Sequence, residues 1–516
     1  MARGREARRL LPKQSSARAA TAAAAGTDSS SGSGSGIGSG NRSMSQQPQR
    51  TVEVTAMDTY GATSVHTITM PTHTSISTYG AMHSVKRQKS GSMGSAGSSA
   101  AATAASLKLS NWQTSFHLIS FMAGSGLLCL PLALVEIDWC GLLLLMVAAI
   151  VSAYTSKLLT EALDVVRWSS GTQVSYSDLG YECFGRFGQY LTAILVHACF
   201  IISCTGYLGI ASSCIAGITG LQTGTVLVLL SITVWFHVFI KSLKSLAVFS
   251  AVNVAIAFWI EAIIFGDAMY PLKQITLETS AFVLDTPDLS DASMAIKLAY
   301  SFSLLSSGFF CHAIIPTFYN TMEDHRQCST IVSRNQLGVM TTLYLPICII
   351  TYAVYGATLQ APVFFNMRNA FVRNLAIVLY TIHLLLSYTV TLFPMQQMFE
   401  NCLLRMPCGA IPTMQVLVQD DLSGGASSTQ LELLIKLVCR TVLVLLTLFL
   451  AYFFTPSTLD VFAYMIVPTT MLSLVFPSIF YWKLCSVDAG YLDKLANGVV
   501  LVLAVASMCG SLTVVI

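Results

Sequence analysis

Charged residues are scarce in this chain of 516 residues. Asp, Glu, Lys and Arg together make up 10% of it, whereas hydrophobic residues make up 54%. Because soluble domains usually carry about a quarter charged residues, this balance indicates a protein that crosses a membrane many times. The formal net charge is only +3, and no patch mixes basic with aromatic residues, so we expect no nucleic-acid partner.

The sequence also lacks the patterns that accompany catalysis or metal binding. Its 14 cysteines include no Cys-x-x-Cys pair, so neither a zinc site nor a redox pair is expected. A phosphate-binding loop and a convincing nucleophile triad are missing as well. We therefore predict no enzymatic activity, no catalytic residue, no metal and no organic cofactor.

Bulky apolar residues are few in residues 1–106, which are rich in Ser, Gly, Ala and Thr. Such a segment buries too little apolar surface to offset the entropy that ordering would remove. It also lacks the hydrophobic run of a secretory signal. We predict that residues 1–106 form a disordered cytosolic tail.

Long apolar segments occupy the rest of the chain. Since about 20 residues cross a bilayer, they predict an all-α polytopic membrane protein with about 11 transmembrane helices. The uneven distribution of Lys and Arg over the loops predicts a cytosolic N-terminus, and an odd number of spans then places the C-terminus in a lumen or outside the cell. The predicted spans lie near residues 113–135, 140–163, 189–216, 222–240, 245–267, 293–318, 335–357, 372–400, 432–455, 459–483 and 490–514.

Two of these spans are interrupted by small residues. Gly-Ser-Gly at 124–126 and then Pro131 break the first span, and Ser-Ser-Gly at 306–308 breaks the sixth. A helix in lipid pairs its own backbone groups, so breaks are tolerated only where the freed groups face protein, water or a ligand. Breaks at corresponding positions of two halves are typical of secondary transporters, where they surround the substrate site.

The breaks also predict how the chain is divided. Five spans lie on each side of an acidic loop, and because five is odd, the two halves enter the membrane from opposite sides. This arrangement is an inverted repeat with one further helix. We predict a first repeat at 107–267, an outer or lumenal acidic loop at 268–292, a second repeat at 293–485 and a terminal helix at 486–516.

The freed backbone groups of two broken helices suit a zwitterion. Exposed N–H groups at a half-helix carry partial positive charge and attract a carboxylate, whereas exposed carbonyl groups attract an ammonium group or a cation. The alternative is that the glycines serve only close helix packing. The predicted substrate-binding residues are Gly124, Ser125, Gly126, Leu127, Tyr207, Ser307, Gly308 and Phe310.

Five short strings resemble the amino acid/auxin permease family. They are the glycine-rich segment 124–131, then 153–159, 176–185, 241–246 and 308–322. In the last string the chain is similar to the vesicular inhibitory amino acid transporters and to the vacuolar amino acid transporters of plants and fungi. The resemblance implies a LeuT-like amino acid permease fold of two inverted five-helix repeats, and transport of amino acids that is often coupled to protons.

Ionisable and hydroxyl side chains inside the spans are candidates for ion coupling. An ionisable residue in a membrane helix suggests a function, and histidine titrates near neutral pH, so these residues are candidates for the proton coupling that the resemblance implies; a structural role is the alternative for Glu261 and His312. Sodium stays open because hydroxyls of the eighth helix hold that ion in sodium-coupled relatives of this architecture. A structural role is favoured for His197 and His383. The ion-coupling candidates are Glu261, His312, Ser387 and Thr389.

These features together predict a secondary active amino acid transporter, coupled to protons, that works by alternating access around its broken first and sixth helices. The alternatives are a sodium-coupled symporter and a non-transporting amino acid sensor that signals through the tail. The expected partners are an amino acid and the lipid bilayer. The expected location is a vesicular, vacuolar, lysosomal or plasma membrane.

Overall fold

A computed structural model describes most of the chain from residue 108 onward and two strands before it. The chain divides into two compact units, Pro12–Ser99 on the one hand and Ala100–Ile516 with Met1–Leu11 on the other. Most of the predicted tail and of the predicted outer loop 268–292 lies outside the described residues. The structure describes residues 50–57, 63–70, 108–124, 126, 130–171, 173–240, 242–269, 289, 291–360, 362–405, 428–454, 465–485 and 490–515.

The described part of the Pro12–Ser99 unit is a pair of strands. β1 (Arg50–Met57) and β2 (Thr63–Met70) pair antiparallel, from Arg50 opposite Met70 to Met57 opposite Thr63. Both strands are rich in Val and Thr, whose branched side chains favour extended backbone. Our sequence analysis assigned no strand to this segment, because those residues are diluted by Ser, Gly and Ala over the whole tail.

The first half of the membrane part begins with a broken helix. Ser110 and Ser175 form capping boxes at the start of α3 and α7, and Gly171 and Gly220 end α6 and α7 in the left-handed conformation, which glycine adopts without a steric penalty. The helices are α3 (Asn111–Met122), α5 (Leu132–Ile137), α6 (Cys140–Ser170), α7 (Tyr176–Thr219), α8 (Thr223–Trp235), which continues as a 3-10 turn (Phe236–Phe239), and α9 (Leu243–Met269).

The second half repeats this order. Two of its helices contain π-helical turns, Met340–Tyr344 and Met471–Val475, and Pro346 and Pro477 lie two positions after these turns. Proline has no N–H for the helical hydrogen bond, so it favours such irregular turns. The helices are α10 (Met294–Ser307), α11 (Ile315–Thr321), α12 (Cys328–Val339), α13 (Leu345–Tyr355), α14 (Ala370–Arg405), α16 (Ser428–Phe454), α18 (Phe476–Cys485) and α19 (Tyr491–Val515).

Eight of the described helical segments are long and apolar enough to cross a membrane. α8 is a shorter apolar helix, and the pairs α3/α5 and α10/α11 are the two broken ones. Every predicted span overlaps one of these segments, so the prediction of an all-α polytopic membrane protein is confirmed. α7 consists of two helices that meet at a kink at Gly185, whose φ is 66°; the predicted third span, 189–216, lies within the second of them.

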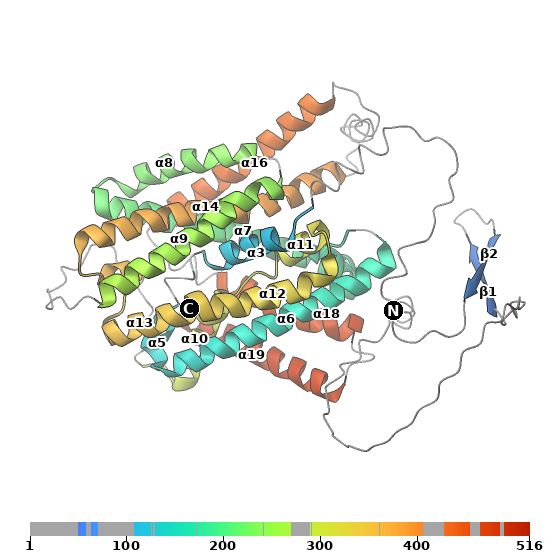
Figure 1. Ribbon diagram of the computed structural model, residues 1–516, viewed down its shortest axis with the longest axis horizontal. Coiled ribbons are helices and arrows are strands. Elements are labelled where there is room, and N and C mark those ends of the chain that lie inside the picture. Colours follow the sequence, from blue (N-terminus) through green and yellow to red (C-terminus); the bar gives the residue numbers. More distant parts are fainter. Residues whose placement is uncertain are drawn as a thin grey trace, which may run out of the picture. The chain divides into compact units, whose positions relative to one another are not determined.

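The two broken helices run in opposite directions (Figure 1). Directly before α3, Leu109 N–H donates to Thr321 O of α11 (2.9 Å), and Glu323 N–H donates to Leu109 O (3.0 Å). At the other end, the Ser301 hydroxyl of α10 donates to Ala133 O of α5 (3.4 Å). The start of each broken helix thus lies beside the end of the other, which is the antiparallel relation that an inverted repeat requires.

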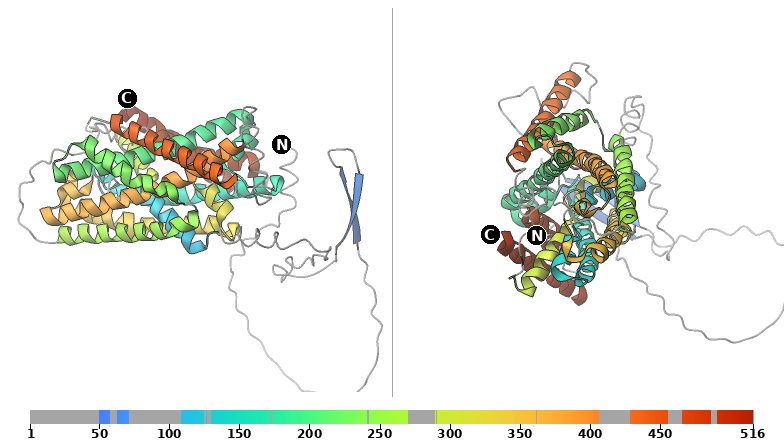
Figure 2. Two further views of the ribbon diagram at one scale, coloured as in Figure 1. Left: turned by 90° about the horizontal axis from the view of Figure 1, so that it is seen from above. Right: turned by 90° about the vertical axis from the view of Figure 1, so that its left-hand side faces the viewer.

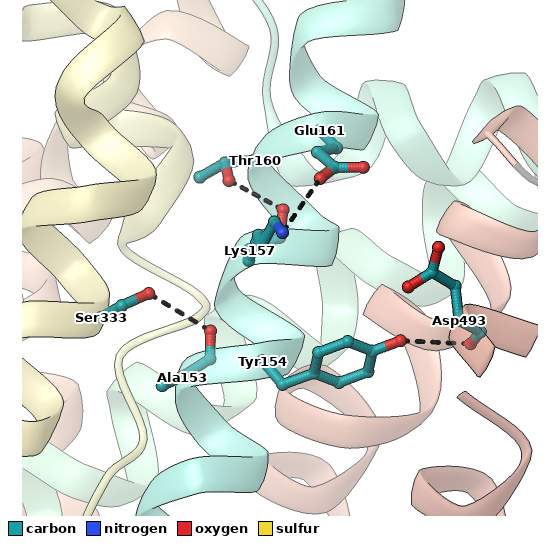
Figure 3. Close-up of polar contacts among 7 residues, drawn as sticks. All are labelled: Ala153, Tyr154, Lys157, Thr160, Glu161, Ser333 and Asp493. Atoms are coloured by element: carbon teal, nitrogen blue, oxygen red, sulfur yellow. Dashed lines mark hydrogen bonds and ion pairs between the residues drawn. The ribbon is translucent and has the colours of Figure 1, made fainter. Parts of the chain in front are cut away.

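Other helices connect the repeats at their edges. α6 lies between α12 and α19: Ser333 of α12 donates to Ala153 O (3.3 Å), and the Tyr154 hydroxyl donates to Asp493 O of α19 (3.3 Å) (Figure 3). In the end-on view of Figure 2, the green α8 and the orange-red α16 lie together at the edge of the bundle. There Trp235 donates to the Thr441 hydroxyl (3.1 Å). The broken helices are therefore held inside a frame of long helices.

Candidate functional site

At the first break, side chains from distant helices replace the missing backbone donors. α3 ends at Met122, and the last carbonyl groups of a helix have no partner within it. The Tyr344 hydroxyl donates to Met122 O (2.6 Å), and Nε2 of His383 lies 3.1 Å from Ala123 O. The break is thus stabilised from the π-helical turn of the seventh span and from α14.

At the second break, a different set of side chains does the same. α10 ends at Ser307, and the Tyr344 hydroxyl also lies 2.8 Å from Gly308 O. The Ser152 hydroxyl of α6 donates to Phe309 O (3.3 Å), and Nε2 of Gln336 lies 3.4 Å from the same oxygen. Hydroxyl and amide groups of α6 and α12 therefore surround this break.

Tyr344 contacts both breaks with one hydroxyl group. That group has a single hydrogen, which is shared between the carbonyl oxygens of Met122 and Gly308. The side chain is fully buried. Our sequence analysis did not name Tyr344, and the only signal near it was Pro346, which marks an irregular turn.

The predicted glycines meet at the centre of this arrangement. A Cβ atom added to Gly126 would lie 3.3 Å from Cα of Gly308, so the two breaks touch. A Cβ atom added to Gly124 would lie 2.5 Å from the hydroxyl oxygen of Tyr207, and one added to Gly308 would lie 2.9 Å from Cδ1 of Leu130. The missing side chains are therefore what lets backbone, Tyr207 and the second break approach one another.

The remaining predicted substrate residues have different surroundings. The Ser307 hydroxyl donates to Leu304 O within its own helix (2.7 Å). Phe310 is buried, and its ring centroid lies 6.2 Å from that of Phe121. Ser125 and Leu127 lie outside the described residues. The structure thus gathers Gly124, Gly126, Tyr207, Gly308 and Phe310 around the breaks, and their role in binding stays a prediction.

Two of the predicted ion-coupling residues lie on α14. Asn253 of α9 donates one amide hydrogen to the Ser387 hydroxyl (2.9 Å) and the other to the Ser120 hydroxyl of α3 (2.7 Å). The Thr389 hydroxyl donates instead to Leu385 O of its own helix (3.0 Å). Ser387 therefore belongs to a polar network that joins α3, α9 and α14 at the first break, whereas Thr389 bonds within α14.

The other two ion-coupling candidates are buried. Glu261 is 5% exposed, and its Oε1 has no hydrogen-bond partner within the part of the chain that the structure describes. In His312, Nε2 lies 2.9 Å from the Thr155 hydroxyl and 3.1 Å from the Ser156 hydroxyl. Its Nδ1 has no partner among the described residues. A buried charge without a partner is costly, so a charge on Glu261 would need compensation from elsewhere.

A buried ion pair connects α14 with α16. Nε of Arg440 on α16 lies 2.7 Å from Oε1 of Glu400 on α14, and Nη1 donates to Ile240 O (2.6 Å). The pair thus holds α14, α16 and the connection before α9 together, away from the breaks. Over the described ranges, no three His, Cys, Asp or Glu side chains are grouped in a way that suits a metal ion.

Two antiparallel broken helices inside a helical membrane bundle are the architecture of a secondary transporter. The chain belongs to the transmembrane amino acid transporter protein family, whose model matches residues 108–516. The family predicted from the five sequence strings is thereby confirmed.

Relatives in Arabidopsis thaliana show the same family at low identity. Amino acid transporter AVT1J is 23% identical over 266 residues, which cover 49% of this chain and 59% of the relative. Amino acid transporter AVT1C is 23% identical over 348 residues, covering 64% and 60%. Amino acid transporter ANT1 is 32% identical over 148 residues, covering 27% and 33%. The chain spans less than two thirds of the length of these relatives.

Among solved structures, the chain is similar to a Na+-coupled sialic acid symporter in its substrate-bound outward-open state. The TM-score is 0.48 and the sequence identity 9%, with 78% of this chain and 90% of the symporter covered.

Proposed function

We propose that this protein is a secondary active transporter of amino acids, coupled to protons. The observation that carries the proposal is the meeting of two helix breaks at Gly126 and Gly308, in a chain that belongs to an amino acid transporter family. Freed backbone groups in the middle of a membrane bundle recur at transporter substrate sites. The printed names of the relatives, which are amino acid transporters, support the same substrate class.

The carbonyl groups around Tyr344 suit the ammonium end of an amino acid. An ammonium group offers three hydrogens, whereas the Tyr344 hydroxyl offers one to Met122 O and Gly308 O together. A substrate ammonium group that takes over one of these carbonyls would relieve this shortage. Free N–H groups of the breaks would receive the carboxylate, and the two helix bundles would then rock around the bound substrate.

The first break favours protons over sodium as the coupling ion. In the sodium-coupled arrangement, a carbonyl of the first helix and a hydroxyl of the eighth hold the ion. Here Ala123 O already faces Nε2 of His383, and the Ser387 hydroxyl already accepts from Asn253. A sodium ion would compete with both contacts for these two oxygens, whereas a proton needs only a titratable side chain.

The orientation follows from the basic loops. With most Lys and Arg in the cytosol, the N-terminus is cytosolic and the C-terminus lies in a lumen. We place the protein in a vesicular or vacuolar membrane, where an acidic lumen supplies the proton gradient.

Uptake into proteoliposomes tests this function. Each radiolabelled amino acid is offered under an imposed pH gradient, an imposed sodium gradient or neither. We expect at least one amino acid to accumulate under the pH gradient and none under sodium alone. Accumulation under the sodium gradient only would show that the coupling ion is sodium and not the proton. Binding without accumulation under either gradient would favour a sensor.

A pair of glycine variants tests the site itself. Gly126→Leu inserts a side chain where the backbone of the second break lies 3.3 Å away, so uptake should be abolished. The matched control is Gly338→Ala, because a Cβ atom there meets no atom within 4 Å. Unchanged uptake by folded Gly126→Leu protein would remove the first break from the site.

A further inference from the structure

The ring of His383 lies between two backbone carbonyl groups. Nε2 is 3.1 Å from Ala123 O at the first break, and Nδ1 is 3.4 Å from Asn253 O on α9. The side chain is fully buried. Carbonyl oxygens only accept hydrogen bonds, and a neutral imidazole donates only one. A neutral ring therefore leaves one nitrogen lone pair facing an acceptor, whereas a protonated ring donates to both.

The two distances agree with a neutral ring in which one nitrogen carries a hydrogen and the other does not. The contact of 3.1 Å lies within the usual range for an N–H donor and a carbonyl acceptor, and that of 3.4 Å lies just outside it. A hydrogen on Nδ1 would turn the longer contact into a hydrogen bond. Both contacts end on main-chain oxygens, which cannot rotate to offer a donor instead.

The other fully buried histidines of the described residues are satisfied differently. His117 has the Ser250 hydroxyl at Nδ1 (2.7 Å) and Leu243 O at Nε2 (2.9 Å), so a hydroxyl donor meets one nitrogen and a carbonyl the other. His312 has the Thr155 and Ser156 hydroxyls at Nε2, which can donate or accept, and its Nδ1 faces no acceptor among the described residues. In neither case does a carbonyl oxygen face each of the two ring nitrogens, so a second N–H would gain no such acceptor.

His383 also lies where a change in bonding reaches the site. Ala123 belongs to the first break, and the side chain of Asn253 connects Ser120 with Ser387. A protonated ring would hold α3, α9 and α14 together through both of its nitrogens. A neutral ring would release one of the two connections.

Few other titratable groups surround this ring. Tyr380 of α14 stacks on it, with centroids 6.2 Å apart. The helices packed against α14 carry His117 on α3, Tyr207 on α7 and Glu261 on α9, the last about two helical turns beyond Asn253. Tyr344 faces the breaks. The acidic groups at the helix ends already have partners: Asp267 accepts from Arg368 N–H (3.0 Å), and Glu400 pairs with Arg440.

We propose that His383 is the site that binds the coupling proton, an inference that rests on the proposed function. When the site faces the acidic compartment, a proton adds to Nδ1. The new Nδ1–H then donates a hydrogen bond to Asn253 O, while Nε2–H keeps its hydrogen bond to Ala123 O. When the breaks rearrange and Ala123 O leaves the ring, one N–H loses its acceptor and the proton departs to the other compartment. The amino acid and the proton are thereby linked through the first break.

The test compares coupled with uncoupled transport in proteoliposomes that contain the full chain and trapped pyranine. The substrate is the radiolabelled amino acid that the wild-type protein accumulates. His383→Gln keeps amide donors for a carbonyl but cannot take up a proton. We expect accumulation under the pH gradient, and the pyranine signal of proton entry, to fall about tenfold or more, since coupling between sites commonly amounts to 5–150-fold. Exchange of labelled for unlabelled amino acid without a gradient should persist.

His197→Gln is the matched control, because within the described part of the chain His197 bonds inside its own helix, to Ala193 O (2.7 Å). It should retain both activities. If His383→Gln also loses exchange, the binding of the amino acid to the purified protein is measured at several pH values instead. Binding that no longer depends on pH supports the inference, and binding with the wild-type pH dependence overturns it.

Coupled accumulation by His383→Gln at the wild-type level would overturn the inference alone. Wild-type protein that exchanges amino acids but accumulates none under the pH gradient would instead overturn the proton-coupled function on which the inference rests.

Discussion

The two breaks contain similar small residues but are stabilised by different chemistry. At the first, His383 offers N–H groups to main-chain oxygens that can only accept. At the second, the Ser152 hydroxyl and the Gln336 amide donate to Phe309 O, and the hydroxyl also accepts from that amide, so the donors there are groups that do not titrate. A titratable ring between two acceptors gains a hydrogen bond when it is protonated, whereas a hydroxyl group can only reorient its hydrogen. The proposed ion coupling therefore concerns the first break, and the second break serves as its comparison.

Removing the hydroxyl that serves both breaks should have the largest effect. Tyr344→Phe leaves the carbonyl groups of Met122 and Gly308 without that donor. Each buried polar group left unpaired costs about 1–3 kcal/mol, so we expect uptake to fall about a hundredfold and the protein to unfold at lower temperature. Initial uptake rates and thermal unfolding in detergent measure the two effects.

Tyr154→Phe is the control for this variant. Its hydroxyl donates to Asp493 O at the edge of the bundle (3.3 Å; Figure 3), so its loss should change uptake little. Equal uptake by both variants would mean that the two breaks do not depend on a shared hydroxyl.

A clash at the first break should have an intermediate effect. Gly124→Ala places a methyl group 2.5 Å from the Tyr207 hydroxyl oxygen, and we expect uptake to fall about tenfold, as overpacking by about 1–3 kcal/mol implies. Adding Tyr207→Phe removes the nearest clashing atom. The double variant should then recover part of the loss, with a coupling of about 1 kcal/mol between the two positions.

Additive losses in that double-mutant cycle would show that Gly124 and Tyr207 do not meet in the working protein. Tyr207→Phe alone provides the cycle's fourth corner and reports any direct role of the hydroxyl in binding.

Changing the second break should have the smallest effect and should leave coupling intact. Gln336→Leu removes the amide that donates to the Ser152 and Ser156 hydroxyls (2.8 and 3.0 Å). Since Ser152 still donates to Phe309 O and Ser156 still bonds Nε2 of His312, we expect only about a threefold loss of uptake, equivalent to about 0.6 kcal/mol. The number of protons moved per amino acid, from pyranine and radiolabel together, should stay at the wild-type value.

Ser333→Ala on the same helix controls for general disturbance of α12, because its hydroxyl donates to Ala153 O away from the breaks (3.3 Å). Loss of proton coupling in Gln336→Leu would transfer the coupling role to the second break.

The membrane spans and both breaks were predictable because their signals are local. Apolar runs of the right length mark the helices, and the glycines and Pro131 mark the first interruption within a few residues of its observed place between α3 and α5. The inverted relation followed from the order of the spans, and the contacts of Leu109 with the end of α11 agree with it.

The side chains that stabilise the breaks were not predictable in the same way. Tyr344, Gln336 and Ser152 lie in ordinary apolar or polar surroundings in the sequence, and His383 looked like a structural histidine. Nothing local marks a residue as the partner of a carbonyl on another helix. Pro346 signalled an irregular turn but not where the Tyr344 hydroxyl would point.

The sequence by itself determined that this chain is a helical membrane protein whose first and sixth spans are broken. Hydropathy, glycine and proline act over a few residues, so their effects can be read along the chain. Only the tertiary structure decided what the breaks contact. Tyr344 is 222 residues from Met122, and His383 is 260 residues from Ala123. Helix packing determines these donors, because a carbonyl group without a partner in its own helix accepts from the donor that a neighbouring helix places within hydrogen-bond distance.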